Sequence, residues 1–236
     1  MAWTRFGRLG AVIAAAAMLY VAPSAAERPR EAPVPAPVPV EVRARTIAHF
    51  EARDAGRRHF GALEFRGGIE LTSPARDFGG ISSIRVERDG ERFLAVTDKG
   101  HWLRGRIRYE GEAPVGIADA EMAPVLGPDG RPITARGWYD AESLAEDGGT
   151  VYLGLERVHN ILRFDFRRHG LMARGLPVAV PRELKQLPPN KGIEGLAVVP
   201  QGLPLAGALI AFSERGLDAD GNIRGFLIGG PRPGLF

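Results

Sequence analysis

The sequence contains no cysteine, so disulfide bonds, thiolate metal sites and a cysteine nucleophile are all excluded. It has no Gly-x-Ser-x-Gly motif, which argues against a serine hydrolase of the nucleophile-elbow type. There is no His-Glu-x-x-His motif, and the five histidines lack ligand-like spacing, so a zinc site is not expected. A glycine-rich phosphate loop followed by Lys and Ser or Thr is also missing. The chemistry of this chain must therefore come from other residue types.

The basic charge of the chain is concentrated in its first residues. The sequence pI is 9.6 and the formal net charge is +3. Residues 1–26 contain Arg5 and Arg8 but no acid, so removing them lowers the charge to +1. A mature charge near zero argues against a dedicated nucleic-acid binder.

The N-terminus is typical of a secretory signal peptide, residues 1–26. Two arginines precede an apolar run, Leu9 to Ala22, and the small residues Ser24-Ala25-Ala26 precede a cut at Glu27. The alternative is an uncleaved membrane anchor, but the run is shorter than the ~20 residues of a spanning helix. No other stretch is suited to crossing a bilayer. We expect export to the periplasm or the extracellular space, with no stable membrane span after cleavage.

After the signal peptide the residue composition changes twice. In residues 27–45 proline alternates with small residues, which predicts an extended linker. From residue 46 to residue 236, short apolar runs recur between Asp-Gly turn signals such as Asp89-Gly90 and Asp147-Gly148. Runs of this length and composition suit β-strands. They include Phe93–Thr97, Val151–Leu155, Leu162–Phe166 and Leu209–Phe212. Only Pro181–Gln186 and Met122–Leu126 hint at helical turns, so the sequence predicts an all-β domain.

Three segments of the domain share one plan: residues 79–100, 139–160 and 191–216. Each begins with a tetrad whose middle residues are small or acidic: Ile81–Ile84, Ala141–Leu144 or Ile193–Leu196. A strand, a turn and a second strand follow, and the second strand ends with an acid followed by a base. The acid-base pairs are Asp98-Lys99, Glu156-Arg157 and Glu214-Arg215. A repeat of antiparallel strands at this spacing is typical of a β-propeller blade.

In a propeller, equivalent positions of successive blades lie at one level around a channel. The three strand-end acids would then converge, as would Glu142 and Glu194 of the tetrads. Three repeats occupy the whole folded part of the chain, whereas propellers usually close with four or more blades. We therefore expect a propeller truncated at the C-terminus or a smaller variant. An open blade edge would favour association with another chain, and no particular oligomer is indicated.

Carboxylates that converge repel one another unless protons or a cation neutralise them, and Ca²⁺ prefers oxygen ligands. The candidate metal ligands are Asp98, Glu142, Glu156, Glu194 and Glu214. The neighbouring bases would bind a substrate anion: Lys99, Arg157 and Arg215. Imidazole titrates near neutrality, so His101 and His159 are the candidate catalytic acid or base. The alternative is that the acids and bases form ion pairs between blades and that the histidines are structural.

Six segments together resemble the phytase-like family known as "esterase-like activity of phytase", found in bacterial envelopes. They are LTSPARDFGGISSIRV (71–86), FLAVTDKGHWLRGRI (93–107), ADAEMAPVLGPDGRPI (118–133), YDAESLA (139–145), LERVHNILRF (155–164) and GIEGLAV (192–198). The resemblance covers roughly residues 60 to 230 and implies a propeller-like fold. It also implies hydrolysis of a small-molecule ester or phosphoester. The alternative function is a non-catalytic propeller that binds a ligand or a protein.

Overall fold

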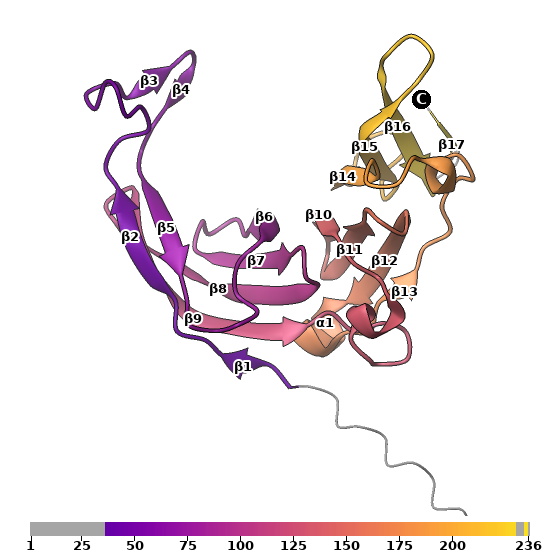
Figure 1. The fold of residues 1–236 in the computed structure, drawn as a ribbon, viewed down its shortest axis with the longest axis horizontal. Coiled ribbons are helices and arrows are strands. Elements are labelled where there is room, and N and C mark those ends of the chain that lie inside the picture. The colour runs from indigo at the N-terminus through magenta and orange to yellow at the C-terminus, as the bar shows by residue number, and fades with distance from the viewer. Residues whose placement is uncertain (1–35, 230–233, 236) are drawn as a thin grey trace, which may run out of the picture. The chain divides into compact units, whose positions relative to one another are not determined.

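The computed structural model describes residues 36–229 and 234–235 (Figure 1). These residues belong to one compact unit, Val34–Phe236. The expected signal peptide, residues 1–26, lies outside the described residues. Within the described part, no helix is long and apolar enough to cross a membrane.

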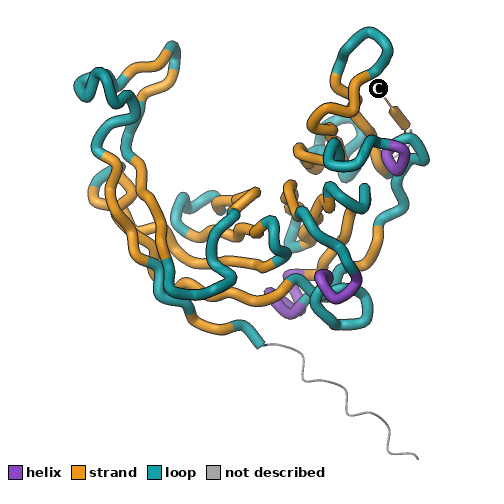
Figure 2. Tube along the Cα trace, viewed as in Figure 1, coloured by secondary structure: helices purple, strands orange, loops and turns teal. Residues whose placement is uncertain are grey.

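The domain is all-β, as predicted, and strands dominate the trace in Figure 2. Three antiparallel sheets follow one another along the chain, and each is built from consecutive strands. The first contains β6 (Ile81–Val86), β7 (Arg92–Thr97), β8 (His101–Glu110) and β9 (Ala113–Pro124). The second contains β10 (Ala141–Asp147), β11 (Thr150–Leu155), β12 (Asn160–Asp165) and β13 (Leu176–Pro177). The third contains β14 (Ile193–Val198), β15 (Leu209–Leu217), β16 (Ile223–Ile228) and β17 (Gly234–Leu235).

The three sheets repeat one backbone detail at the entry of their first strands. The pairing register slips by one residue after Ile81, after Ala141 and after Ile193, which leaves Ser82, Glu142 or Glu194 as the bulged residue. A backbone hydrogen bond lies next to each bulge. It joins the amide of Asp98, Glu156 or Glu214 to the carbonyl of Gly80, Asp140 or Gly192, at 2.8, 2.7 and 2.9 Å. Because the first and second strands of each sheet are antiparallel, the start of the first strand, with its bulge, lies beside the residue of the second that directly precedes the acid.

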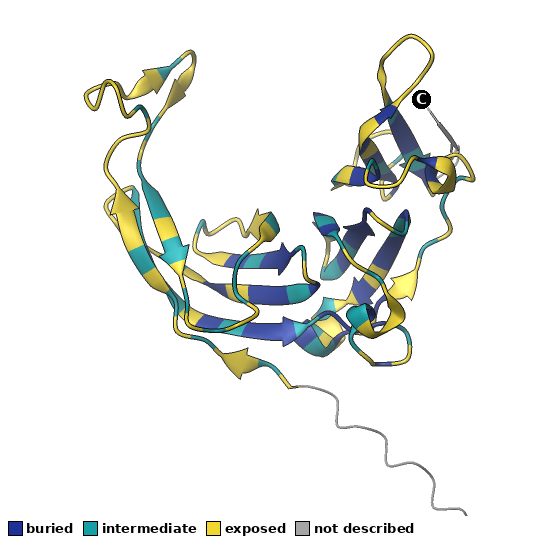
Figure 3. Ribbon diagram, viewed as in Figure 1, coloured by how far each residue is buried: buried dark blue, intermediate teal, exposed yellow. Residues whose placement is uncertain are grey.

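The first strands of the sheets are spatial neighbours, since β10 contacts both β6 and β14. Two apolar cores join the sheets, and Figure 3 shows the buried strands that form them. One core joins the first and second sheets around Trp102, Leu153 and Phe164. The other joins the second and third sheets around Ile161, Leu209 and Phe226. Trp102 and Phe164 pack edge to face, with ring centroids 5.2 Å apart.

The N-terminal described residues extend the first sheet and cover its other face. β1 (Val38–Pro39) pairs with β9, and β2 (Arg43–Ile47) pairs with β5 (Gly68–Thr72). A short hairpin, β3 (His59–Phe60) and β4 (Leu63–Glu64), lies between them in the chain. Val40 and Val42 pack on a third apolar cluster that contains Phe93, Leu103 and Met122.

The expected linker, residues 27–45, therefore includes residues that pair in sheets. β1 and the first half of β2 lie inside it, so the folded region begins before residue 46. Pro39 is compatible with this position because β1 is an edge strand, where a missing amide donor is tolerated. Alternating prolines predict an extended backbone, but they do not distinguish a free linker from an edge strand.

Within residues 36–229, helical structure is limited to short turns. The expected turn at Pro181–Gln186 corresponds to a 3-10 turn at Leu184–Gln186, and two others occupy Ile133–Arg136 and Gly170–Met172. The hint of a helix at Met122–Leu126 was wrong, because Met122 to Pro124 complete β9. One turn of α-helix, α1 (Phe166–His169), begins where a strand was expected to continue. Asp165 caps it by accepting a hydrogen bond from the amide of Arg168 at 3.1 Å.

Candidate functional site

Three carboxylates from three different elements meet in one place. Glu156 directly follows β11, Glu194 is the bulged residue of β14, and Glu214 lies within β15. One carboxylate oxygen from each residue lies within 4.8 Å of those of the other two. The site therefore gathers residues up to 58 positions apart in the chain, from the second and the third sheets.

Glu156 is the most firmly held of the three. It is only 4% exposed, and its Oε1 accepts a hydrogen bond from the amide of Gly192 at 3.2 Å. The chain passes so close here that a Cβ atom on residue 192 would lie 2.5 Å from the carbonyl oxygen of Glu156. Only glycine fits at this position without displacing the backbone. Gly192 therefore both holds the carboxylate and allows the second and third sheets to approach.

More acids surround this group. Burial first, and then the charges of Glu194, Asp140, Glu156 and Asp98, raise the pKa of Glu142 to about 7. The pKa of Glu194 is also raised, first by burial and then by Glu156, Glu214 and Asp140. We refer to these residues as the acidic cluster: Asp98, Asp140, Glu142, Glu156, Glu194 and Glu214. Because like charges resist joint ionisation, the cluster favours protons or a cation in its midst.

Asp98 is the strand-end acid of the first repeat and is equivalent to Glu156 in the second. Glu142 belongs to the tetrad of the second repeat and is equivalent to Glu194 in the third. The Oδ1 atom of Asp98 is buried and has no hydrogen-bond partner among the described residues. A Cβ atom on Gly80 would meet this oxygen at 2.3 Å, so the carboxylate lies directly against that glycine. The five predicted metal ligands thus lie in one electrostatic neighbourhood, and three of them have the spacing of a metal site.

Two of the three predicted substrate-binding cations already contact acids. The Nε atom of Arg157 lies 3.1 Å from Oδ2 of Asp140, and the Nε atom of Arg215 lies 3.7 Å from Oε1 of Glu214. Lys99 is exposed and forms no ion pair within the described part of the chain. Arg157 and Arg215 are mostly exposed, so these pairs are weak enough to be exchanged for a ligand anion.

The two predicted catalytic histidines lie in different surroundings. His159 is 8% exposed, and its amide donates to the carbonyl of Glu156 at 3.2 Å, which places it beside the acidic cluster. Its Nδ1 atom is buried and has no hydrogen-bond partner among the residues described. Its backbone is left-handed, with φ of 46°, a conformation in which histidine is several-fold enriched.

His101 instead lines a separate cavity of about 400 Å³, whose lining includes no residue of the acidic cluster. Its Nε2 atom lies 3.8 Å from Oδ2 of Asp77, and its amide donates to Oγ1 of Thr97 at 3.1 Å. His159 is therefore held by its backbone next to Glu156, whereas the His101 side chain lines a separate cavity.

Sequence reasoning missed Asp140. Its backbone carbonyl closes the bulge of the second sheet, its side chain pairs with Arg157, and its charge raises the pKa of Glu142. A signal was present, because Asp140 occupies the repeat position that Gly80 and Gly192 occupy elsewhere. Its φ of 54° is the left-handed value that aspartate tolerates better than most residues.

Comparison with known proteins finds a family model that matches the chain. The sequence model of the Phytase-like family, described as "esterase-like activity of phytase", matches residues 76–230. No curated protein matches the chain.

Two solved structures that match are those of U3-55K and of dihydro-heme d1 dehydrogenase NirN in complex with DHE. U3-55K is 14% identical with a TM-score of 0.36, over 63% of this chain and 35% of that one. NirN is 12% identical with a TM-score of 0.38, over 71% of this chain and 32% of that one. The chain thus spans about a third of the length of each.

Proposed function

Because this chain belongs to the phytase-like family, we propose that it binds Ca²⁺ in the acidic cluster and hydrolyses phosphate or carboxylate esters there. The observation that carries the proposal is the meeting of Glu156, Glu194 and Glu214 oxygens within 4.8 Å. Carboxylate oxygens at this spacing match the ligand preference of Ca²⁺, which tolerates irregular geometry. The raised pKa values of Glu142 and Glu194 support it, because they reflect burial first and then the negative charge of the neighbouring acids.

We propose that the fold is of the propeller type. The support is the common plan of the three sheets, which repeat the same bulge and the same closing hydrogen bond. The contacts of β10 with β6 and β14 are those expected of first strands that line a propeller axis. We further propose export to the periplasm or the extracellular space, because residues 1–26 have the parts of a signal peptide.

A bound Ca²⁺ would supply positive charge to polarise the phosphoryl or carbonyl oxygen of the substrate. In this proposal Glu156 and Glu194 hold the cation, and Arg157 and Arg215 exchange their acid partners for the substrate anion. Hydrolysis joins a water oxygen to the phosphorus or carbonyl carbon, breaks the ester bond and leaves a proton on the departing alcohol. His159 is the proposed proton carrier because it lies beside Glu156 and its Nδ1 atom is unpaired within the described region.

The alternative function is a non-catalytic module that binds a ligand or a protein. Two observations favour it: Arg157 and Arg215 are already paired with acids, and the cluster contains no serine or cysteine nucleophile. Under this alternative the cation would stabilise the sheet edges, and turnover of esters would be absent.

Calorimetric titration of the purified mature chain with Ca²⁺ tests the site. We expect wild-type protein to bind Ca²⁺, and Glu156→Gln or Glu194→Gln to weaken binding by at least tenfold, because each removes one charged ligand. Glu110→Gln is the matched control, since Glu110 is exposed on β8 and outside the cluster. Equal Ca²⁺ affinity in all four proteins would exclude the acidic cluster as a metal site.

Hydrolysis of p-nitrophenyl phosphate and p-nitrophenyl acetate, with Ca²⁺ and with chelator, then separates the two functions. Turnover that is lost with chelator and in Glu156→Gln supports the hydrolase. Folded protein that binds Ca²⁺ but turns over neither ester supports the binding module.

A further inference from the structure

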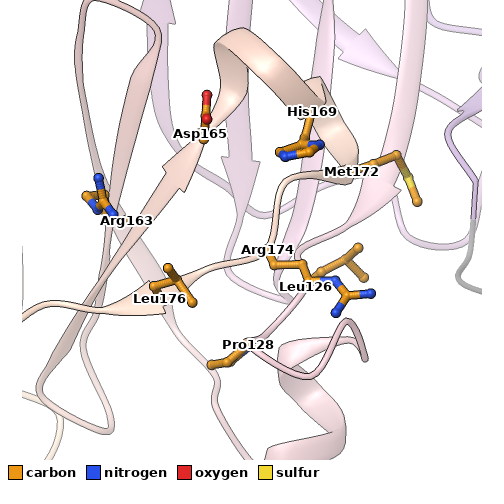
Figure 4. Close-up of a pocket in the computed structure, with 8 residues that line it drawn as sticks. All are labelled: Leu126, Pro128, Arg163, Asp165, His169, Met172, Arg174 and Leu176. Atoms are coloured by element: carbon orange, nitrogen blue, oxygen red, sulfur yellow. The ribbon is translucent and has the colours of Figure 1, made fainter.

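A second cavity, of about 590 Å³, lies at the outer side of the second sheet (Figure 4). β12, β13 and the segment that follows β9 contribute to its wall, and Figure 4 shows their side chains around it. An isolated bridge between Leu126 and Arg174, and a hydrogen bond from the amide of Gly175 to the carbonyl of Leu126 at 2.8 Å, hold this wall together. No residue of the acidic cluster lines the cavity.

Two arginines line it without an acidic partner. Arg163 and Arg174 are both exposed, and neither forms an ion pair or a side-chain hydrogen bond with any residue that the structure describes. The guanidinium of Arg174 instead lies against Gly130, where a Cβ atom would be 2.9 Å from its Cζ. The nearest acid in that turn, Asp129, is occupied by Arg136 at 2.8 Å. Both guanidinium groups are therefore available to an anion.

One acid also lines the cavity. Asp165 accepts a hydrogen bond from the amide of Arg168 at 3.1 Å, so part of its charge is used to cap α1. His169 is a further potential donor on the same wall. With two arginines against one aspartate that is engaged in a cap, the polar part of the cavity favours a negatively charged ligand.

The remaining lining is apolar. Leu126 is buried, Met172 is half-buried, and Leu176 is 48% exposed where it faces the opening. Leu176 pairs with Arg163 across β12 and β13, so a cation and an exposed aliphatic side chain stand next to each other. This combination matches a ligand with one charged end and one apolar end.

We propose that this cavity binds a small organic anion, a phosphate-type or carboxylate group attached to an apolar moiety. Figure 4 shows the Arg163 and Arg174 guanidinium groups on opposite sides of the lining, so both side chains turn toward the anionic group when it binds. The planar guanidinium matches both phosphate and carboxylate geometry. Leu126, Met172 and Leu176 cover the apolar moiety. The site differs from the acidic cluster in its residues and needs no cation.

Titration calorimetry with phenylphosphonate, in the presence of chelator, tests the proposal, because its carbon–phosphorus bond is not an ester bond. Benzoate tests the carboxylate form of the ligand, while inorganic phosphate and phenol each carry only one of the two ends. We expect phenylphosphonate or benzoate to bind at least tenfold more tightly than phosphate or phenol. Equal affinity for phenylphosphonate and inorganic phosphate, together with equal affinity for benzoate and phenol, would overturn the proposal.

Variants that remove a positive charge and a variant that removes a negative charge from the cavity test the proposal further. We expect Arg163→Gln and Arg174→Gln each to weaken binding about tenfold, the effect of losing one charge-assisted hydrogen bond. Asp165→Asn should instead strengthen binding, since asparagine also caps a helix but carries no charge. Arg182→Gln is the matched control, because Arg182 is exposed and does not line the cavity. If the Arg163→Gln, Arg174→Gln double variant is folded and binds like wild type, the site is wrong.

Binding of phenylphosphonate to this cavity does not depend on the proposed Ca²⁺ site in the acidic cluster. Glu156→Gln should leave phenylphosphonate binding unchanged, because Glu156 does not line the cavity. If Glu156→Gln abolishes binding of the probe while Arg174→Gln has no effect, the probe occupies the acidic cluster and not this cavity.

Discussion

Glu142 shows most clearly what the crowding of acids does to a single residue. Its pKa is about 7 in the folded protein and near the ordinary value of 4.5 in the unfolded chain, so the folded protein holds the proton more tightly. Its contribution to stability is therefore fully present below pH 4.5 and is lost as the pH rises through 7.

This sign gives a prediction for the protein without metal. In chelator, the free energy of unfolding should fall between pH 4.5 and pH 7.5, and Glu142→Gln should remove a fall of about 1 kcal/mol, allowing for solvent around this half-buried group. Denaturant titrations at several pH values measure it. Glu110→Gln should keep the wild-type pH dependence, and an identical slope in Glu142→Gln and wild type would contradict the prediction.

At the residue scale, the sequence placed more of the candidate site than of its surroundings. Alignment of the repeats predicted that Asp98, Glu156 and Glu214 converge and, separately, that Glu142 and Glu194 do. The meeting of Glu194 with Glu156 and Glu214 joins members of both sets, which equivalence of repeat positions alone does not predict. Asp140 was missed because the other two repeats have glycine, Gly80 and Gly192, at this position. The two histidines were indistinguishable in sequence, since the cavity that holds His101 depends on which strands pack together.

At the scale of the element, the strand-entry bulge depends on the residues that precede it. Gly192 has no room for a side chain, because a Cβ atom would lie 2.5 Å from the Glu156 carbonyl oxygen and 2.8 Å from its Cγ. We expect Gly192→Ala to destabilise the fold by about 1–3 kcal/mol, as over-packing does, and to weaken Ca²⁺ binding by displacing Glu156. Thermal unfolding and calorimetry measure the two effects.

Gly195→Ala is the matched control for that change. Gly195 lies three residues further along the chain, within β14, and its nearest neighbours, atoms of Phe212, are 3.5 Å from the position of a Cβ atom. Ordinary van der Waals contact should cost less than the clash at Gly192. If both variants unfold at the same temperature as wild type, the close approach is not a constraint.

Strand positions were more predictable than element ends. Aliphatic runs between Asp-Gly turns located β7, β11 and β15, because burial on at least one face dictates such residues. The switch from β12 to α1 was missed, since Asp165 ends the strand by capping the next turn, and a cap is local chemistry inside an apolar run. The strands before residue 46 were missed because their partners, β9 and β5, lie far along the chain.

At the scale of the whole domain, the apolar cores between sheets decide whether the site exists at all. Trp102 is fully buried between the first and second sheets and packs edge to face on Phe164 and Phe166. We expect Trp102→Ala to cost about 3–5 kcal/mol, the range for removing a buried aromatic side chain. Denaturant unfolding monitored by circular dichroism measures this.

Trp102→Phe should cost less, because it keeps a ring and removes an indole N–H that is buried without a partner in the described structure. An equal loss in both variants would show that the indole shape, and not the buried aromatic surface, matters. The all-β class was predictable from sequence, whereas the propeller type remains a prediction from the repeats.

The repeated strand-entry hydrogen bond has a wider consequence. The bond joins backbone atoms only, so the bulge it closes does not depend on the side chain displayed there: serine at position 82, glutamate at 142 and 194. Scaffold and chemistry are thus separable in this domain. Substitutions at the bulged positions can therefore change the charge of the acidic cluster one residue at a time, while the backbone around them stays the same.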